Sequence, residues 1–372
     1  MSRRIASSRP ARGALLWGIG LFLASQLVFA LLLEAGLTKL NDPEYEHRLA
    51  LLRARLSEAP SQRPLMLVLG SSRAAMGVCP DRLTPPHPDS SAPLIFNFSL
   101  LGSGPVMELM CLRRLLDDGI RPDAVLIECW PPFLNQEKHN AEEQRFDKSR
   151  LRWGDVALLD RYWSGEGRIR REWAAARAVP AYSSRFVILN RYLPKWLPWY
   201  RRVHGTWTNL DPWGWQACAD PEANDAMYRA RVEIARQFYE PVLQDFHISP
   251  IADQALRELL TLCRRERIGA ALVILPEGST FRSWYPASVR ARTDVYFASL
   301  CQEFHVPLVD ARDWIADGQF YDGFHLLPQG ALAFSERLRQ QWMLSVLIAH
   351  SETWRAAGVS PPMLLSAPRS PR

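Results

Sequence analysis

One long apolar run near the amino terminus constrains this chain more than any other feature. Residues 14–33 read ALLWGIGLFLASQLVFALLL, and only Ser25 and Gln26 interrupt the run with polar side chains. At a rise of about 1.5 Å per residue, a helix of this length crosses a bilayer core of about 30 Å. Four arginines and no acidic residue lie in residues 1–13. The positive-inside rule therefore keeps residues 1–13 in the cytoplasm and exports the rest of the chain.

A cleaved signal peptide is the alternative interpretation of this run. Val28-Phe29-Ala30 offers small enough residues for a cleavage site. Leu31-Leu32-Leu33 continue the apolar run past that point, which favours a retained anchor over residues 14–35. We therefore expect a single-pass protein of the inner (cytoplasmic) membrane whose main domain lies on the extracytoplasmic, periplasmic side; both interpretations export residues 35–372.

Short apolar runs alternate with helical patterns in the exported part. Continuous apolar strands separated by helices predict a parallel sheet that is buried on both faces. The expected fold class is α/β, a three-layer α/β/α domain with a central parallel five-stranded sheet. The predicted strands are 65–70, 94–99, 123–129, 270–276 and 306–310, and the predicted helices are 40–60, 105–118, 252–267, 288–304 and 328–348.

Residues 136–250 interrupt this alternation and divide the α/β domain into segments 60–135 and 251–350. The interrupting stretch holds eight of the 14 tryptophans, and a structureless loop of that length is implausible, so we expect a large, mostly helical insertion or cap. Its segment 191–216 interleaves aromatic and basic residues, which fits lid packing, a membrane-interface patch or a groove for a sugar or acyl chain. The Pro- and Ser-rich residues 356–372 are typical of a disordered tail.

Charge and cysteine content exclude several function classes. The net charge is +6 without a long Lys/Arg run, so nucleic-acid binding is not expected. The six cysteines show no CxxC or Cys/His ligand spacing, so neither a zinc site nor another cofactor is predicted. Lone cysteines in apolar stretches are typically buried thiols, although an even number in an exported chain is compatible with a disulfide.

Three short segments carry residues suited to chemistry. Gly70-Ser71-Ser72-Arg73 follows the first predicted strand, where a serine at a helix N-terminus has backbone N–H groups able to hold an oxyanion. The three-residue spacing of Asp322 and His325 allows the carboxylate to orient the imidazole, as a nucleophile–base pair requires. In the third segment, Asn97 to Gly104, a glycine can bring a backbone N–H close to a ligand. Each segment alone is also compatible with an ordinary capped turn.

Together these segments resemble the SGNH (GDSL-like) hydrolase superfamily. GSS stands where the family has GDS, which puts Ser72 at the nucleophile position. Asn97 and Gly102 match the second block loosely, with Ser99 at the usual glycine position. The D-x-x-H block with a glycine five residues after the histidine is matched fully by Asp322, His325 and Gly330. The third block, G-x-N-D, is replaced by ECWPPFLN, which ends at Asn135.

The resemblance implies a serine esterase or O-acyltransferase without a cofactor. Ser72, Asp322 and His325 would be catalytic, and Ser72, Gly102 and Asn135 would form the oxyanion hole. Arg73 and Asn97 are candidates for substrate binding, although a structural role for Arg73 is also open. Membrane-tethered branches that act in alginate O-acetylation or teichoic-acid D-alanylation resemble this chain most. They imply an acylated glycan or other ester substrate and a multi-pass membrane O-acyltransferase as partner; a non-catalytic accessory protein is the alternative.

Overall fold

The computed structural model describes residues 9–35, 42–59, 63–84, 92–136, 142–164, 167–197, 209–218 and 225–340. The predicted tail 356–372, the end of the predicted helix 328–348 and most of the 1–13 segment lie outside these residues. Two of the tryptophans in the insertion, Trp199 and Trp207, lie outside them as well.

The described residues contain a sheet of five parallel strands, as the apolar runs predicted. Its strand order is β2-β1-β3-β4-β5, and every neighbouring pair is parallel. The α/β fold class is therefore confirmed. The strands are β1 (Leu65–Leu69), β2 (Leu94–Asn97), β3 (Ala124–Glu128), β4 (Gly269–Ile274) and β5 (Leu308–Asp310).

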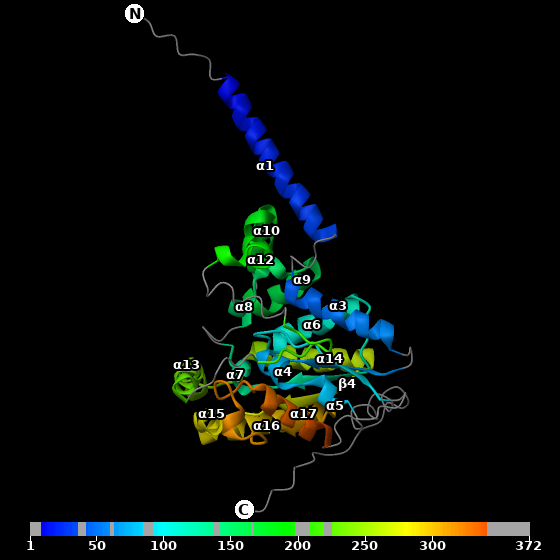
Figure 1. Ribbon diagram of the computed structural model, residues 1–372, viewed down its shortest axis with the longest axis vertical. Coiled ribbons are helices and arrows are strands. Elements are labelled where there is room, and N and C mark those ends of the chain that lie inside the picture. Colours follow the sequence, from blue (N-terminus) through cyan, green and yellow to red (C-terminus); the bar gives the residue numbers. More distant parts are fainter. Residues whose placement is uncertain are drawn as a thin grey trace, which may run out of the picture. The chain divides into compact units, whose positions relative to one another are not determined.

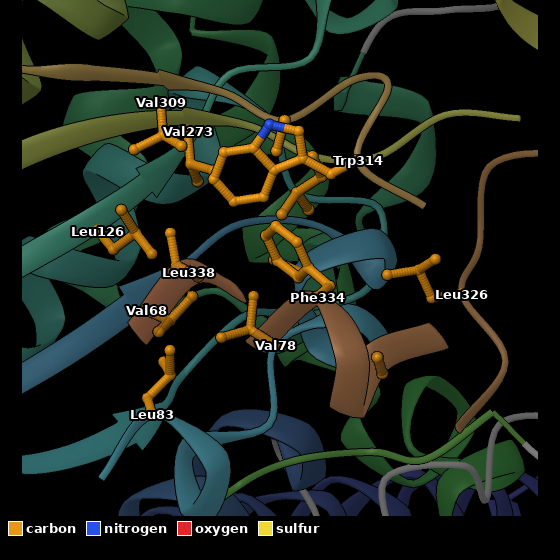
Figure 2. Close-up of a cluster of buried hydrophobic side chains, with 14 of the residues drawn as sticks. Val68, Val78, Leu83, Leu126, Val273, Val309, Trp314, Leu326, Phe334 and Leu338 are labelled. Atoms are coloured by element: carbon orange, nitrogen blue, oxygen red, sulfur yellow. The ribbon is translucent and has the colours of Figure 1, made fainter. Parts of the chain in front are cut away.

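Both faces of the central strands are buried, which explains why the sequence shows continuous apolar runs there rather than alternation. All residues of β1, β3 and β4 are buried. Because side chains alternate across a strand, Val68, Leu126 and Val273 share one face. They pack with Trp314 and Phe334 in the cluster that Figure 2 shows.

Helices cover each face of the sheet. One face carries α17 (Pro328–Gln340), which packs against α4 (Ser72–Gly77) and α5 (Pro80–Leu83). On the other face, α14 (Pro250–Glu266) packs against β4, α6 (Pro105–Asp117) and α16 (Ala287–Phe304). Figure 1 shows β4 between α14 and α17. The shorter helices of this domain are α7 (Pro131–Leu134), α8 (Glu142–Arg145), α15 (Ser279–Ser283) and the 3-10 helix η6 (Asp317–Gln319).

The amino-terminal apolar run forms one long helix, α1 (Arg9–Ala35). Its segment Ala11–Leu32 is long and apolar enough to cross a membrane. Large apolar side chains on it are exposed, for example Trp17 at 75% and Leu16 at 69%. An apolar surface of this kind fits a membrane anchor, and a signal sequence has the same properties.

Contacts divide the chain into two compact units. One comprises residues 1–47 and 147–205, and the other residues 48–146 and 206–372, so the boundary falls within α3 (Pro43–Glu58). The predicted insertion 136–250 is thus shared: its middle part groups with α1, and α13 (Asp225–Gln244) groups with the sheet. The described residues of the insertion are mostly helical, as predicted. Its remaining elements are η2 (Lys148–Arg150), α9 (Trp153–Leu159), the π-helix η3 (Asp160–Ser164), α10 (Arg168–Ala178), α11 (Pro180–Ser183), α12 (Arg185–Tyr192) and η4 (Pro194–Trp196).

All six cysteines are buried free thiols. Burial raises the pKa of Cys263 to about 12, since the thiolate is poorly solvated there. These side chains therefore act as small apolar residues rather than as disulfide partners.

Candidate active site

The order of the strands creates a topological switch point at the carboxyl end of β1. The chain runs from β1 to β2 on one side and then crosses back to β3 on the other side. In open α/β sheets, ligands bind outside the carboxyl ends of the strands at such a switch point. The Ser72 segment follows β1 directly, and Glu128 is the last residue of β3.

Ser72, His325 and Asp322 form a chain of hydrogen bonds at this edge. The Ser72 Oγ lies 2.8 Å from the His325 Nε2, although the two residues are 253 positions apart in sequence. The His325 Nδ1 lies 2.7 Å from the Asp322 Oδ2. Because the carboxylate accepts the proton on Nδ1, the Nε2 lone pair is directed at the serine hydroxyl. A hydroxyl held in this way can be activated as a nucleophile.

The loop before α17 holds Asp322 in position for this role. Its Oδ1 accepts the backbone N–H groups of Phe324 at 3.2 Å and His325 at 2.9 Å. Burial raises the pKa of Asp322, but the charge of His325 and these hydrogen bonds outweigh it, and the resulting pKa lies below the ordinary value. Asp322 therefore remains a carboxylate beside the imidazole.

The lowered pKa of Asp322 predicts a pH-dependent contribution to stability. A carboxyl group with a depressed folded-state pKa stabilises the fold fully above its unfolded pKa of about 3.9. That contribution is lost as the pH falls through the folded-state pKa. As the pH falls from 5 to 2, we expect the Tm of Asp322→Asn to decrease less than the Tm of the wild type. Parallel curves for the two proteins would contradict the assignment.

Hydrogen bonds between Ser71 and Glu128 fix the turn that carries Ser72. Ser71 is the N-cap of α4, and its hydroxyl accepts the N–H of Arg73 at 3.1 Å. Both the N–H and the hydroxyl of Ser71 donate to the Glu128 Oε2, at 2.7 and 2.8 Å. Among the described residues no acceptor takes the N–H of Ser72. This N–H stays free to donate to an oxyanion.

The buried side chain of Arg73 bonds to several segments around the site. Its guanidinium donates to the carbonyl of Phe324 at 3.3 Å and pairs with Glu128 at 3.4 Å. It also donates to the carbonyls of Leu275 and Pro276, each at 3.0 Å. The residue is only 2% exposed, so Arg73 does not reach a substrate. It connects the turn that carries Ser72 to the loop that carries His325.

A second carboxylate and an aromatic cluster complete this buried layer. The Glu277 Oε1 lies 3.8 Å from the Arg73 Nη2 and accepts hydrogen bonds of 2.9 Å from the Trp130 indole and the Tyr285 hydroxyl. The Arg73 guanidinium also lies over the Trp130 ring, 4.6 Å from its centroid. The Phe324 ring stacks on the Trp130 ring, with the two centroids 5.3 Å apart. It also contacts the His325 ring, with those centroids 4.2 Å apart.

Gly70 is required for space rather than for an unusual backbone angle. A Cβ at this position would lie 2.7 Å from the Cβ atoms of both Ala74 and Glu128. Contacts that short force the turn or the Glu128 side chain to move.

We therefore expect Gly70→Ala to destabilise the protein by about 1–3 kcal/mol through overpacking. Urea unfolding measures the change. The exposed Gly154, which a Cβ would leave without any contact within 4 Å, supplies the control Gly154→Ala. Equal effects of the two substitutions would contradict this explanation.

The structure does not place Asn97 where a substrate can reach it. Its side chain is fully buried, and its amide nitrogen donates to the carbonyls of Ala74 and Val78, both at 2.8 Å. Its amide oxygen accepts the N–H of Ser99 at 3.1 Å. Asn97 thus fastens the end of α4 to β2, and the substrate-binding role proposed from the sequence does not fit this geometry.

The Asn135 side chain bonds to the end of α13. Its amide nitrogen donates to the carbonyls of Val242 at 3.2 Å and Asp245 at 3.1 Å, so it holds the end of α13. The expected role of Asn135 in an oxyanion hole does not fit these bonds.

The glycine-containing segment after β2 is held by hydrogen bonds to the Glu142 carboxylate. Gly102 has a φ of +75° and lies beside Arg145. The Glu142 carboxylate accepts the N–H groups of Gly104, Val106 and Met107 at 2.7–3.1 Å. It therefore caps α6, and the N–H of Gly104 is not available to a ligand.

Sequence patterns did not reveal the roles of Glu128, Glu142 and Glu277. A charged residue at the end of an apolar strand was the one available signal for Glu128. Among the described residues, no group of three or more His, Cys, Asp or Glu side chains is placed to hold a metal ion.

Fold and geometry together define an α/β protein with a Ser–His–Asp arrangement at the switch point of its sheet. The model of a family described as Protein of unknown function (DUF1574) matches residues 19–151. This match includes the part of α1 from residue 19 on, the first three strands and Ser72, but it ends before Asp322 and His325. No curated protein matches the chain.

Proposed function

We propose that this protein is a membrane-anchored, extracytoplasmic serine esterase or O-acyltransferase of the SGNH type that acts on cell-envelope glycans. The chain of hydrogen bonds from Ser72 through His325 to Asp322 is the observation that carries the proposal. The apolar α1 supports anchoring in a membrane, and the location that we propose is the cytoplasmic membrane, with the sheet domain in the periplasm.

The reaction follows from these groups. His325 takes the Ser72 proton as the Oγ attacks an acyl carbonyl, and Asp322 stabilises the imidazolium. The N–H of Ser72 donates to the developing oxyanion. His325 then protonates the departing alcohol, which leaves an acyl group on Ser72. Water or a sugar hydroxyl takes the acyl group, and a multi-pass membrane O-acyltransferase is the proposed partner in such a transfer.

One observation favours a second candidate, a non-catalytic accessory that binds a glycan or the partner enzyme. The side-chain amides of Asn97 and Asn135 are both bonded to backbone carbonyls. Loss of one oxyanion donor typically costs about 3 kcal/mol of barrier height. Among the described residues, the site thus has the nucleophile and the base but no side-chain amide placed to complete the oxyanion hole.

Covalent labelling with a fluorophosphonate separates the two candidates. We expect the full chain in detergent to be labelled and to hydrolyse p-nitrophenyl acetate, and Ser72→Ala to lose both properties. The exposed Ser57 on α3 provides the control Ser57→Ala, which should behave as the wild type. A folded wild-type chain that is not labelled, or labelling that persists in Ser72→Ala, would contradict the enzymatic proposal and favour the non-catalytic accessory protein.

A further inference from the structure

The short helices of residues 168–197 leave apolar side chains only partly covered. In α12, Phe186, Val187, Ile188 and Leu189 follow one another, and no residue of this helix is buried. At 100° per residue, four consecutive side chains point to nearly all sides of a helix. Because these four side chains are only half-buried, apolar surface of α12 remains available to a membrane or another apolar partner.

Exposed aromatic residues extend this surface on both sides of α12. Tyr182 is 64% exposed, Tyr192 61% and Trp196 76%, and Leu193 beside them is 41% exposed. Tryptophan and tyrosine combine an apolar ring with a polar group, which suits the boundary between lipid tails and headgroups.

The charge of this segment complements an anionic surface. Residues 168–197 hold seven basic residues and one acidic residue, so the segment carries a net charge of +6, equal to that of the whole chain. The Arg185 guanidinium lies 3.5 Å from the Tyr182 ring centroid and 4.3 Å from that of Phe186. Long basic side chains next to buried rings keep their charge at the headgroups while their stems stay among apolar groups.

The contact between α1 and α11 sets a depth for this surface. The N–H of Ala181 donates to the Gln26 Oε1 at 3.3 Å, and Gln26 is six residues before Leu32, where the apolar span ends. At 1.5 Å per residue this places α11 about 9 Å inside the span. Interfacial helices bury their apolar faces about 5–10 Å deep.

We propose that residues 168–197 form a lipid-binding surface that inserts at the boundary between the headgroups and the acyl chains of an anionic bilayer beside α1. The protein would thus contact the membrane twice, once through the spanning helix and once through this surface. The proposal does not depend on catalysis by Ser72.

Site-specific fluorescence on the full chain in vesicles tests it. Trp196→Cys is labelled with bimane and placed in phosphatidylglycerol–phosphatidylcholine vesicles, and Val295→Cys on α16 is the control because Val295 is equally exposed, at 71%, in the other unit. Brominated lipids should remove most of the fluorescence at position 196, and aqueous iodide most of that at position 295. Iodide quenching at 196 equal to that at 295 would overturn the proposal.

A charge variant tests the preference for anionic lipid. Combined Arg185→Gln, Arg191→Gln and Lys195→Gln should reduce lipid quenching at position 196 in the anionic vesicles. The matched control replaces the exposed Arg236, Arg264 and Arg265 by glutamine and should leave it unchanged. Equal quenching in all three proteins would contradict the role of charge.

Discussion

Replacing His325 by alanine is expected to lower kcat/KM for p-nitrophenyl acetate by about 10⁴-fold or more, because Ser72 loses the base that takes its proton. The Nε2 of His325 lies 2.8 Å from the Ser72 Oγ, and the described residues place no other imidazole at that hydroxyl. Since residues of such a triad act as a unit, the double variant Ser72→Ala, His325→Ala should be no slower than either single variant.

The control for this prediction is an exposed histidine outside the site. His305 ends α16 with a φ of 54°, a conformation that asparagine tolerates, so His305→Asn should keep both activity and Tm. Additive losses in the double variant, or unchanged hydrolysis in His325→Ala, would show that the two groups do not work together.

Arg73→Met is expected to destabilise the sheet domain by about 3–5 kcal/mol, because it leaves the buried carboxylates of Glu128 and Glu277 without their cation. In a domain of this size such a loss lowers Tm by roughly 10 °C or more. Thermal unfolding followed by circular dichroism measures it. The loop that carries His325 also loses its bond from Arg73 to the Phe324 carbonyl, so fluorophosphonate labelling of the folded variant should be slower.

Arg236→Met is the matched control, because Arg236 pairs with Glu233 on the exposed surface of α13. Exposed pairs are screened by water, so little change in Tm is expected. A similar Tm for both variants would mean that the buried ion pair contributes nothing to the stability of the site.

The sheet was predictable because strands buried on both faces need unbroken apolar runs, a local property of the sequence. The pairing of Asp322 with His325 was predictable for the same reason, since the two residues are only three positions apart. The buried layer of Arg73, Glu128 and Glu277 was not, because its members come from three distant segments and meet only when β1, β3 and β4 lie side by side.

The sequence by itself determined an apolar helix of membrane-spanning length, the alternation of strands and helices, and the residue types of a Ser–His–Asp site. Only the tertiary structure decided which side chains lie together at Ser72. It directed Asn97, Asn135 and Arg73 into the protein, because buried carbonyls and carboxylates require hydrogen-bond partners and these side chains supply them. It also brought Ser72 to His325, since the order of parallel strands sets which loops share one edge of the sheet.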